Sequence, residues 1–379
     1  MTWQILDSNY EQAKITVIGV GGGGGNSVHH MIKSEIKGVE FICANTDSQD
    51  LTKIHKAKKI KLGEEFTKGL GAGNDPERGR VATELSIPEI RDALEHTEML
   101  FIVAGMGGGT GTGGSPVIAK VAKELGILTV AVVTTPFKYE QEKRAEQARA
   151  GISKLMQSVD SCIEIDNEKI FEIFPANAQF NEGFNAVNEV ITNAVRGVSN
   201  VILNPATMNV DFADVQAAMS QKGMAIMCIG KAKGLNRAVD AVNDALNNPF
   251  FNKAEVKNAK GLLVNICGAS GMEMQEINEI MKQAQSISQQ GVEAIPGLTI
   301  DESYGDEIVV TIIATGLRRF NLDEFSNSYI RPVRDINTVR KELEGYVDPE
   351  KLNLIDLHDV IRSIEAVSYT HLTLPTICS

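Results

Sequence analysis

Glycines gather in three short windows of this 379-residue chain, and these windows are the residues best suited to bind a phosphate. Almost half of the 34 glycines lie in Gly19–Gly25, Gly69–Gly73 and Gly105–Gly114. A loop without Cβ atoms lets backbone N–H groups and a helix N-terminus approach a phosphate closely. Glycine tracts also serve as flexible linkers. Here, however, the first and third windows each follow an apolar, strand-like run, so we predict a nucleotide phosphate site.

The first window also fits GxGxxG at Gly19–Gly24, the fingerprint of a dinucleotide-binding fold. An NAD-dependent oxidoreductase is therefore a rival hypothesis. Such a fold uses an acid near the end of its second strand to bind ribose, and Asp47 lies further along than the usual offset of about 20 residues. The second loop, GGGTGTG at Gly107–Gly113, has no use in a dehydrogenase. This second glycine loop therefore argues against a dinucleotide and favours another kind of nucleotide.

Alternating strands and helices are expected to position these loops. Strand-like runs occur at 14–20, 39–44, 99–104 and 128–134, with helical stretches at 116–125 and 140–159. Short β-branched runs separated by helices predict a parallel sheet that is covered on both faces. Because the carboxyl ends of such strands meet at one edge, both glycine loops are expected there. The first half of the chain is thus predicted to be an α/β domain.

A long amphipathic helix is expected to join this domain to a second one. Apolar residues recur at helical spacing from Val187 to Ile202, and Leu203-Asn204-Pro205 ends the pattern, since proline cannot continue a helix. A second α/β pattern follows, with helices at 214–220, 237–246 and 272–289 and strands at 224–230, 261–267 and 307–316. Residues after about 320 lose the strand pattern and predict a linker with a short helix near 337–343.

Composition narrows the class of protein. The net charge of −12 opposes non-specific binding to nucleic acid or anionic lipid, so neither nucleic acid nor direct membrane insertion is expected. No apolar run approaches the roughly 18 residues of a membrane span, and the N-terminus shows no secretory pattern. The five cysteines form no CxxC pair and the histidines no ligand spacing. We therefore predict no metal site built from side chains, and a reduced, cytoplasmic compartment.

Taken together, the motifs resemble those of the tubulin/FtsZ GTPase family. GGGTGTG looks like the family signature, and motif order from Lys14 to Gly316, about four-fifths of the chain, is similar to that of the bacterial cell-division members. Further matches are Gly21–Asn26, Asn45-Thr46-Asp47, Gly69–Gly73, Thr135-Pro136-Phe137 and Asn209–Val215. The resemblance implies a tubulin-like, Rossmann-related GTP-binding domain over 13–177 with a parallel sheet. A central helix over 178–203 would join it to a smaller α/β C-terminal domain over 204–317, for GTPase activation and polymerisation. Residues 1–12 would be an N-terminal arm and 318–366 a linker or tail.

The resemblance also implies roles for individual residues. Two loops would cradle the phosphates of GTP or GDP, a third would sense the γ-phosphate, and Mg²⁺ is expected on the phosphates. The loop residues are Gly21, Gly22, Gly23 and Gly24 with Asn26 and Asn45; Gly71, Ala72 and Gly73; and Gly107, Gly108, Gly109, Thr110, Gly111, Thr112 and Gly113. Glu140 and Arg144 would contact ribose and phosphate, with Arg144 offering a charged fork.

Guanine recognition would fall to Asn167, Phe184, Asn188 and Glu189, with Phe184 stacking on the base. The family usually has Asp where this chain has Glu189, and commonly Pro where it has Asp166. A glutamate at the first position keeps a carboxylate that can accept from guanine N1–H and the 2-amino group, but with a longer reach.

Asn209, Asp211 and Asp214, in NVDFADV, form a second constellation. An Asp before a helix is most often an N-cap, and Asp214 fits that role. The 14 helical steps from Glu189 to Leu203, at about 1.5 Å each, span about 21 Å, so these groups are not expected to reach a nucleotide in the same molecule. The resemblance implies that this loop of one subunit completes the GTP site of the next, head to tail. Asp211 and Asp214 would orient or polarise the attacking water and Asn209 would position it.

The expected function is a GTPase that polymerises head to tail and forms the cytokinetic ring at the bacterial division site. Its partners would be itself and the membrane tethers and regulators of that ring, in the cytoplasm at midcell. A tubulin-like GTPase filament of another duty, such as plasmid partition, is the alternative, and an NAD-dependent oxidoreductase a weaker one. Residues 367–379 (VSYTHLTLPTICS) contain no Asp, Glu, Lys or Arg and resemble a translated sequencing adapter. We therefore expect that the native product is not represented beyond Ala366.

Overall fold

The computed structural model describes residues 13–173, 180–203, 212–248, 256–288, 292 and 294–317. All the described residues belong to one compact unit. Four predicted features lie outside the described residues: the N-terminal arm (1–12), the linker or tail (318–366), the segment expected to be non-native (367–379) and the proline stop after Leu203.

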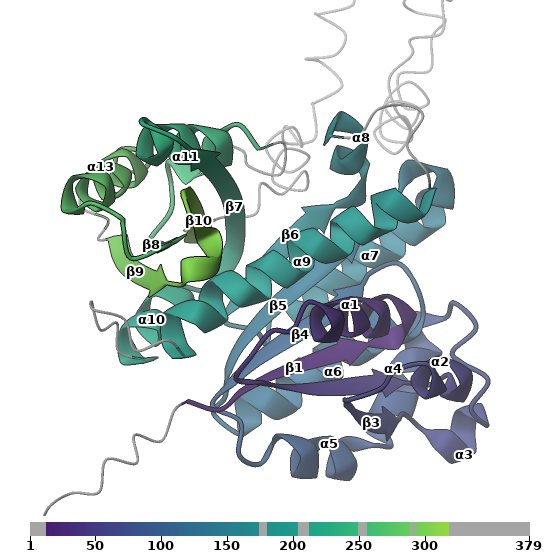
Figure 1. Ribbon diagram of the computed structural model, residues 1–379. Coiled ribbons are helices and arrows are strands. Elements are labelled where there is room, and N and C mark those ends of the chain that lie inside the picture. Colours follow the sequence, from purple (N-terminus) through teal and green to yellow (C-terminus); the bar gives the residue numbers. More distant parts are fainter. Residues whose placement is uncertain are drawn as a thin grey trace, which may run out of the picture. The chain divides into compact units, whose positions relative to one another are not determined.

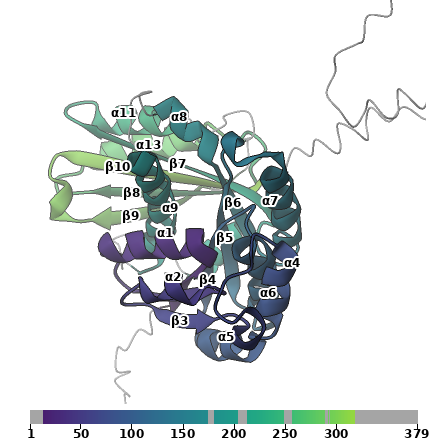
Figure 2. The same cartoon turned by 90° about the vertical axis from the view of Figure 1, so that its right-hand side faces the viewer.

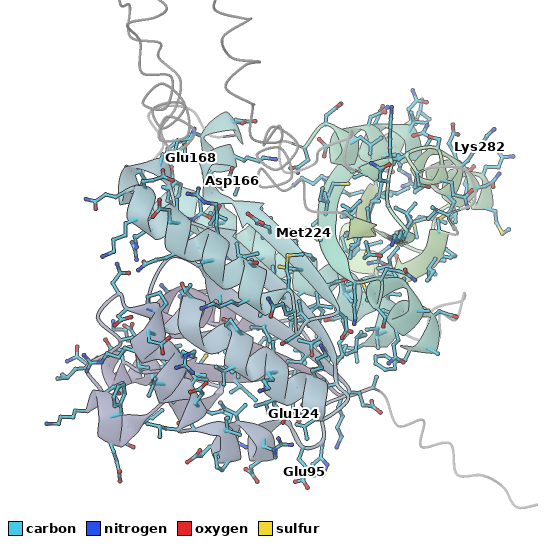
Figure 3. All side chains as sticks on the ribbon, turned by 180° about the vertical axis from the view of Figure 1, so that it is seen from behind. Glu95, Glu124, Asp166, Glu168, Met224 and Lys282 are labelled. Carbon is cyan, nitrogen blue, oxygen red and sulfur yellow. The ribbon has the colours of Figure 1, made fainter. Side chains whose placement is uncertain are left out.

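Six parallel strands build the first part of the sheet (Figure 1). They lie in the order β3-β2-β1-β4-β5-β6, and every neighbouring pair is parallel. Their bounds are β1 Ile15–Val20, β2 Val39–Asn45, β3 Lys58–Lys61, β4 Met99–Gly105, β5 Leu128–Thr135 and β6 Ser161–Asp166. All the carboxyl ends therefore lie at one edge. Figure 3 shows Asp166, which ends β6, at the opposite end of the sheet from Glu95 and Glu124, which precede β4 and β5.

The same sheet continues into the second half of the chain. β7 (Gly223–Lys233) is parallel to β6 through three residue pairs, Ser161↔Gly223, Cys162↔Met224 and Ile163↔Ala225. Beyond β7 follow β10 (Glu307–Leu317), β8 (Gly261–Gly268) and β9 (Ala294–Ile300). β10 is antiparallel to both of its neighbours, and β9 is parallel to β8. One ten-stranded sheet thus runs through both predicted α/β regions, and the domain boundaries stay predictions.

Helices cover both faces of the parallel strands (Figure 2). α1 (Gly21–Lys33) and α9 (Phe180–Leu203) lie on one face, and α4 (Pro76–Glu84), α5 (Ile87–Leu94), α6 (Thr110–Glu124) and α7 (Glu142–Leu155) lie on the other. Strand alternation follows this division, because Ile15 and Val17 enter the core under α1 and α9 while Ile18 and Val20 enter the core under α6 and α7. This explains why the strands read as continuous apolar runs.

The remaining helices are shorter or belong to the second half. α10 (Phe212–Met219), α11 (Arg237–Leu246) and α13 (Met274–Gln285) pack on the last four strands, and α2 (Ser48–Thr52), α3 (Glu64–Thr67) and α8 (Ile170–Ile173) sit in connections. Three 3₁₀ turns lie at Lys138–Glu140, Asn167–Lys169 and Glu302–Tyr304. Among the helices of the described residues, none has the length and apolar character that crossing a membrane requires.

Most predicted elements agree with these bounds to within four residues, and the long helix is confirmed as α9; the exception is α6, which begins at Thr110 and not at the predicted residue 116. Three strands escaped the sequence pattern. β3 and β9 are the two edges of the sheet, where short, lysine-rich or proline-containing strands are tolerated, and β9 contains Pro296. β6 (SCIEID) carries polar residues that mask its apolar alternation.

Candidate nucleotide-binding site

A cavity of about 750 Å³ opens at the carboxyl edge of the parallel strands. Its lining comes from the ends of four neighbouring strands, namely Val20, Asn45, Gly105 and Thr135, and from the loops that follow them. The two glycine loops predicted from the sequence therefore do converge on one edge. Nearly all the remaining lining residues are polar or glycine, as a site for a charged ligand requires.

Two helix N-termini face this cavity. α1 begins at Gly21 directly after β1, with no intervening loop, and Gly21 has φ +71°, a conformation that favours glycine. α6 begins at Thr110, immediately after Gly107–Gly109. Gly21, Gly22 and Gly23 line the cavity from α1, and Gly108, Gly109, Thr110 and Gly111 line it from the second loop. Unpaired N–H groups and helix dipoles thus point at the same space, which suits an anion.

Other glycines of the two predicted loops serve packing instead. A Cβ on Gly24 would lie 2.2 Å from the carbonyl oxygen of Val103, and a Cβ on Gly113 would lie 1.9 Å from that of Pro76. These glycines let α1 approach β4 and let α6 approach α4. Neither Gly24 nor Gly113 lines the cavity. Gly107, with φ +97°, and Thr112 are also absent from the lining of the cavity. The Gly107 N–H donates a hydrogen bond of 2.8 Å to Thr112 Oγ1.

A backbone hydrogen bond holds the remaining glycine window, Gly69–Gly73, beside the carboxyl end of β2. The Gly71 N–H donates to the Thr46 carbonyl at 3.2 Å, and Thr46 Oγ1 lies 2.7 Å from Thr110 Oγ1 on the signature loop. Gly71 and Asn74 line the cavity, whereas Ala72 is buried and packs against Gly109. Gly73 is outside the lining. This loop therefore contacts the signature loop directly, so a ligand group that moves one would disturb the other.

Glu140 and Arg144 form one wall of the cavity. They are an ion pair between Arg144 Nη1 and Glu140 Oε2, and the Glu140 carboxylate also accepts from the Phe137 N–H at 3.0 Å. Arg144 Nε is buried and has no hydrogen-bond partner. A guanidinium with an unpaired donor beside two glycine loops is well placed to bind a phosphate or a ribose hydroxyl.

A second cavity of about 620 Å³ adjoins the first and shares Gly23, Asn26, Gly105, Asn167 and Phe184 with it. It extends between α1 and α9. Phe184 is 39% exposed and makes an edge-to-face contact with Phe137, so its ring is available for stacking. Asn167 is buried, yet its Oδ1 has no hydrogen-bond partner. A planar, polar group such as a nucleobase fits this pair of features.

Asn188 enters the second cavity from α9, and its Oδ1 accepts a hydrogen bond of 2.8 Å from Ser27 Oγ on α1. His29, His30 and Lys33 form the end of this cavity. Burial, followed by the nearby charges of Lys33, His55 and His30, lowers the pKa of His29 below its ordinary value. His29 is therefore expected to be neutral at pH 7, whereas Lys33 supplies a positive charge to this part of the cavity.

Glu189, a predicted guanine contact, lines a different cavity. Its side chain is absent from the linings of both adjoining cavities and instead lines a third one, between α9 and the strands of the second half. Its carboxylate lies 3.7 Å from His30 Nε2 and 3.9 Å from Arg196 Nη1. From α9, Asn188 lines the base cavity and Glu189 does not.

Of the three predicted catalytic residues, the structure describes one, Asp214. Asn209 and Asp211 are outside the described residues. Asp214 lies in α10, beyond the far end of α9 from Phe184, and lines none of the cavities described above (Figure 1). α10 begins at Phe212, so Asp214 is inside the first turn and is not the N-cap. Val215 and Met219 anchor the helix in the core while Asp214 is exposed.

Several lining residues were not among the predicted site residues: Ser27, Thr46, Asp47, Asp50, Asn74, Met106, Thr134, Thr135 and Pro136. Asp47 had a visible signal, because it follows the second strand, and it caps α2 by accepting from the Gln49 N–H at 2.8 Å. Asp47 and Asp50 offer carboxylates near the phosphate loops. Within the described ranges, no group of three or more His, Cys, Asp or Glu side chains could hold a metal.

Comparisons with known proteins agree on one family. The model of the tubulin/FtsZ family GTPase domain matches residues 14–175, and that of the FtsZ family C-terminal domain matches residues 223–318. The chain is 44% identical to the cell division protein FtsZ of Coxiella burnetii, over 83% of this chain and 82% of that protein. It is 46% identical to that of Pseudomonas aeruginosa, over 83% and 80%. A solved empty FtsZ dimer from M. jannaschii superposes with a TM-score of 0.76 at 38% identity, over 82% of this chain and 93% of that one.

Proposed function

This chain belongs to the FtsZ family of tubulin-like GTPases, and on that premise we propose which of its residues bind GTP and where the catalytic site is completed. It is a GTPase of bacterial cell division that self-associates. Because these relatives are cell division proteins, neither alternative function, a filament for plasmid partition or an NAD-dependent oxidoreductase, is favoured.

GTP spans the two adjoining cavities. Its phosphates bind at the N-termini of α1 and α6, against Gly22, Gly23 and Gly108, with Arg144 on the ribose side. Its guanine enters between α1 and α9, stacks on Phe184 and is read by Asn188 and Asn26. The observation that carries this proposal is the unpartnered Oδ1 of buried Asn167, which lies where the cavities meet and lacks a donor that a nucleotide would supply.

Magnesium fits the phosphate end of this site. Mg²⁺ usually keeps several waters and is held by one or two carboxylates together with phosphate oxygens, and Asp47 and Asp50 are carboxylates of the lining. When bound, it would neutralise charge on the β- and γ-phosphates. The role of this chain is then to hold the phosphates with backbone N–H groups.

Hydrolysis requires a second subunit. Asp214 is exposed on α10, and the 15 helical steps between Asn188 and Leu203 already span about 22 Å, so Asp214 cannot reach a nucleotide bound to its own subunit. Large apolar side chains are exposed near the nucleotide edge, with Leu70 at 78% and Tyr139 at 58%. A head-to-tail neighbour would cover them and bring Asp214, with Asn209 and Asp211, to the γ-phosphate, where these residues would orient the attacking water.

A mixing experiment tests this arrangement. Asp214→Ala is expected to bind GTP normally and to lower kcat at least about 100-fold, because the water is no longer oriented. Gly108→Asp is expected not to bind GTP, since its carboxylate would repel the phosphates. An equimolar mixture should hydrolyse GTP faster than either variant alone, because the second supplies Asp214 to nucleotide held by the first.

Asp240→Ala is the matched control, since Asp240 is also an exposed acid in the first turn of a helix, α11. It should leave kcat unchanged. Normal turnover by Asp214→Ala, or a mixture that is no faster than its components, would refute completion of the site by a neighbour.

The site of action follows from the family's role. We expect this GTPase to assemble in the cytoplasm at the division site, with tethers that link it to the membrane. A fluorescent fusion of the chain in dividing bacteria should form a midcell band, and a diffuse signal would contradict this expectation.

A further inference from the structure

Ser27 occupies an unusual position between the two ends of the nucleotide site. It lies on α1, is only 3% exposed, and lines the base cavity beside Asn188. Its Oγ lies 2.8 Å from Asn188 Oδ1 on α9 and 3.2 Å from the Gly23 carbonyl oxygen in the phosphate loop. One hydroxyl thus contacts both the loop that holds phosphates and the amide that faces the base.

A bond from Ser27 to its own helix would be unremarkable. Serine side chains often donate to the carbonyl four residues earlier, and Gly23 is that residue. The shorter contact, however, is the one to Asn188, which is distant in sequence and belongs to another helix. The hydroxyl has a single proton, and the shorter distance favours Asn188 Oδ1 over the Gly23 carbonyl oxygen as its acceptor.

This contact fixes the orientation of the Asn188 amide. A carboxamide can present either its oxygen or its NH₂ group in a given direction. The oxygen binds a donor on the base, whereas the NH₂ group binds an acceptor. Ser27 holds the oxygen on its own side, where one of the two oxygen lone pairs remains for a donor on the base. The N1–H and 2-amino groups of guanine are such donors, whereas hypoxanthine lacks the 2-amino group.

We propose that Ser27 is a positioning residue for purine selection: it orients the Asn188 carboxamide so that the site distinguishes a purine that carries a 2-amino group from one that does not. This inference rests on the proposed function, in which Asn188 reads the base. Ser27 itself need not touch the nucleotide. Its effect should therefore appear in the choice between nucleotides rather than in phosphate binding.

The test compares the binding of GTP and ITP, which differ only in the 2-amino group. Dissociation constants are measured by competition with a fluorescent guanine nucleotide at protein concentrations too low for assembly. Ser27→Ala is expected to lower the ratio Kd(ITP)/Kd(GTP) about fivefold, the usual effect of one neutral hydrogen bond. Ser27→Thr keeps the hydroxyl and should restore most of the preference.

Thr192→Val is the matched control. Thr192 is fully buried on α9 and its Oγ1 lies 3.1 Å from His30 Nδ1, so this variant also removes a hydrogen bond between α1 and α9, but one that does not involve Asn188. It should leave the ratio unchanged. An equal fall in both variants would show that general loosening between the helices is responsible, and would overturn the proposal.

A double-mutant cycle tests the proposal without relying on Ser27→Ala alone. In an Asn188→Ala background, Ser27→Ala should change the ratio no further, because the amide that it orients is gone. An additional fall would also overturn the proposal. If the unaltered chain does not prefer GTP to ATP, the proposed function itself fails. If it prefers GTP but Ser27→Ala keeps the GTP/ITP ratio, only the role of Ser27 fails.

Discussion

At the scale of single residues, the glycines of the two phosphate loops divide into two kinds. Some, such as Gly108, leave space that a ligand can fill, since the nearest atom to an added Cβ is Arg144 Nη2 at 3.8 Å. Others, such as Gly113, let two helices touch. A sequence motif lists both kinds together, because it does not record whether the space beside each glycine is open or filled by protein.

Substitution by alanine should separate these roles. Gly113→Ala places a Cβ 1.9 Å from the Pro76 oxygen and 2.6 Å from the Arg80 nitrogen, so it should lower the free energy of unfolding by about 3 kcal/mol despite the better helix propensity of alanine. Gly108→Ala should leave stability unchanged and weaken GTP binding about tenfold. Denaturant unfolding without nucleotide and a binding titration would measure both, and the reverse pattern would contradict this division.

Buried thiols give the protein a pH dependence. Burial raises the pKa of Cys43 to about 12, against the opposing charge of Lys59, and it also raises the pKa of Cys228 and Cys267. A thiol ionises near pH 8.5 in the unfolded chain. Its stabilising contribution is therefore complete below that pH and is lost as the pH rises toward the folded value.

For Cys43, we expect the free energy of unfolding to fall by about 2 kcal/mol between pH 8 and pH 10. Urea titrations at the two pH values would measure this. In Cys43→Ala, the fall in the free energy of unfolding between the two pH values should be smaller by this amount. An equal fall in that variant would show that Cys43 is not responsible.

At the scale of elements, Arg237 joins three parts of the second half. It begins α11, and its guanidinium donates to both carboxylate oxygens of Glu276 on α13, at 2.7 and 2.9 Å. It also contacts Asp306, before β10, at 3.0 Å. The side chains of Arg237 and Glu276 are only 12% and 17% exposed. Bidentate, partly buried pairs of this kind contribute more than surface pairs do.

Arg237→Ala should therefore lower the free energy of unfolding by about 2 kcal/mol, because Glu276 is left without its partner. Arg149→Ala, which breaks the exposed pair with Glu142, is the control and should cost less than about 0.5 kcal/mol. The hydrogen bonds from Arg237 lower the pKa of Glu276. The contribution of the pair is thus present above the ordinary glutamate pKa of about 4.3 and is lost as the pH falls below it. The difference between the variant and the unaltered chain should shrink below pH 4, and a constant difference would contradict this account.

Sequence reasoning identified the strong elements and missed the weak ones. Buried strands such as β1 and β4, and the apolar stripe of α9, follow directly from periodicity. α10 begins two residues before its predicted start, which moves Asp214 from a cap into the first turn. Asn188 and Glu189 could not be distinguished without the rotation of α9, since a list of motif positions carries no information about which side of a helix faces the ligand.

At the scale of the whole molecule, the class of fold was predictable but the continuity of the sheet was not. Two α/β patterns separated by a helix predict two domains, and nothing in the β6 or β7 sequences indicates that these strands pair. The pairing depends on α9 crossing the sheet and returning the chain beside β6 (Figure 1). Long-range register of this kind is set by tertiary packing, because the local pattern of each strand is satisfied by any neighbour.

The short pairing of β6 with β7 has a mechanical consequence. Within a filament, tension would pass from the nucleotide edge of each subunit to α10, and this path crosses from the first six strands to the last four. The strand pairing at this crossing consists of three residue pairs, whereas β5 and β6 share six; the core under α1 and α9, which includes both Ile15 and Ile313, also joins the two parts. One side has a core of its own between Ile18 and Cys162, and the other has one between Cys228 and Leu317. Under tension, the strand pairing at this seam would therefore give way more easily than that between β5 and β6, and the core under α9 would carry the remaining load between the two parts.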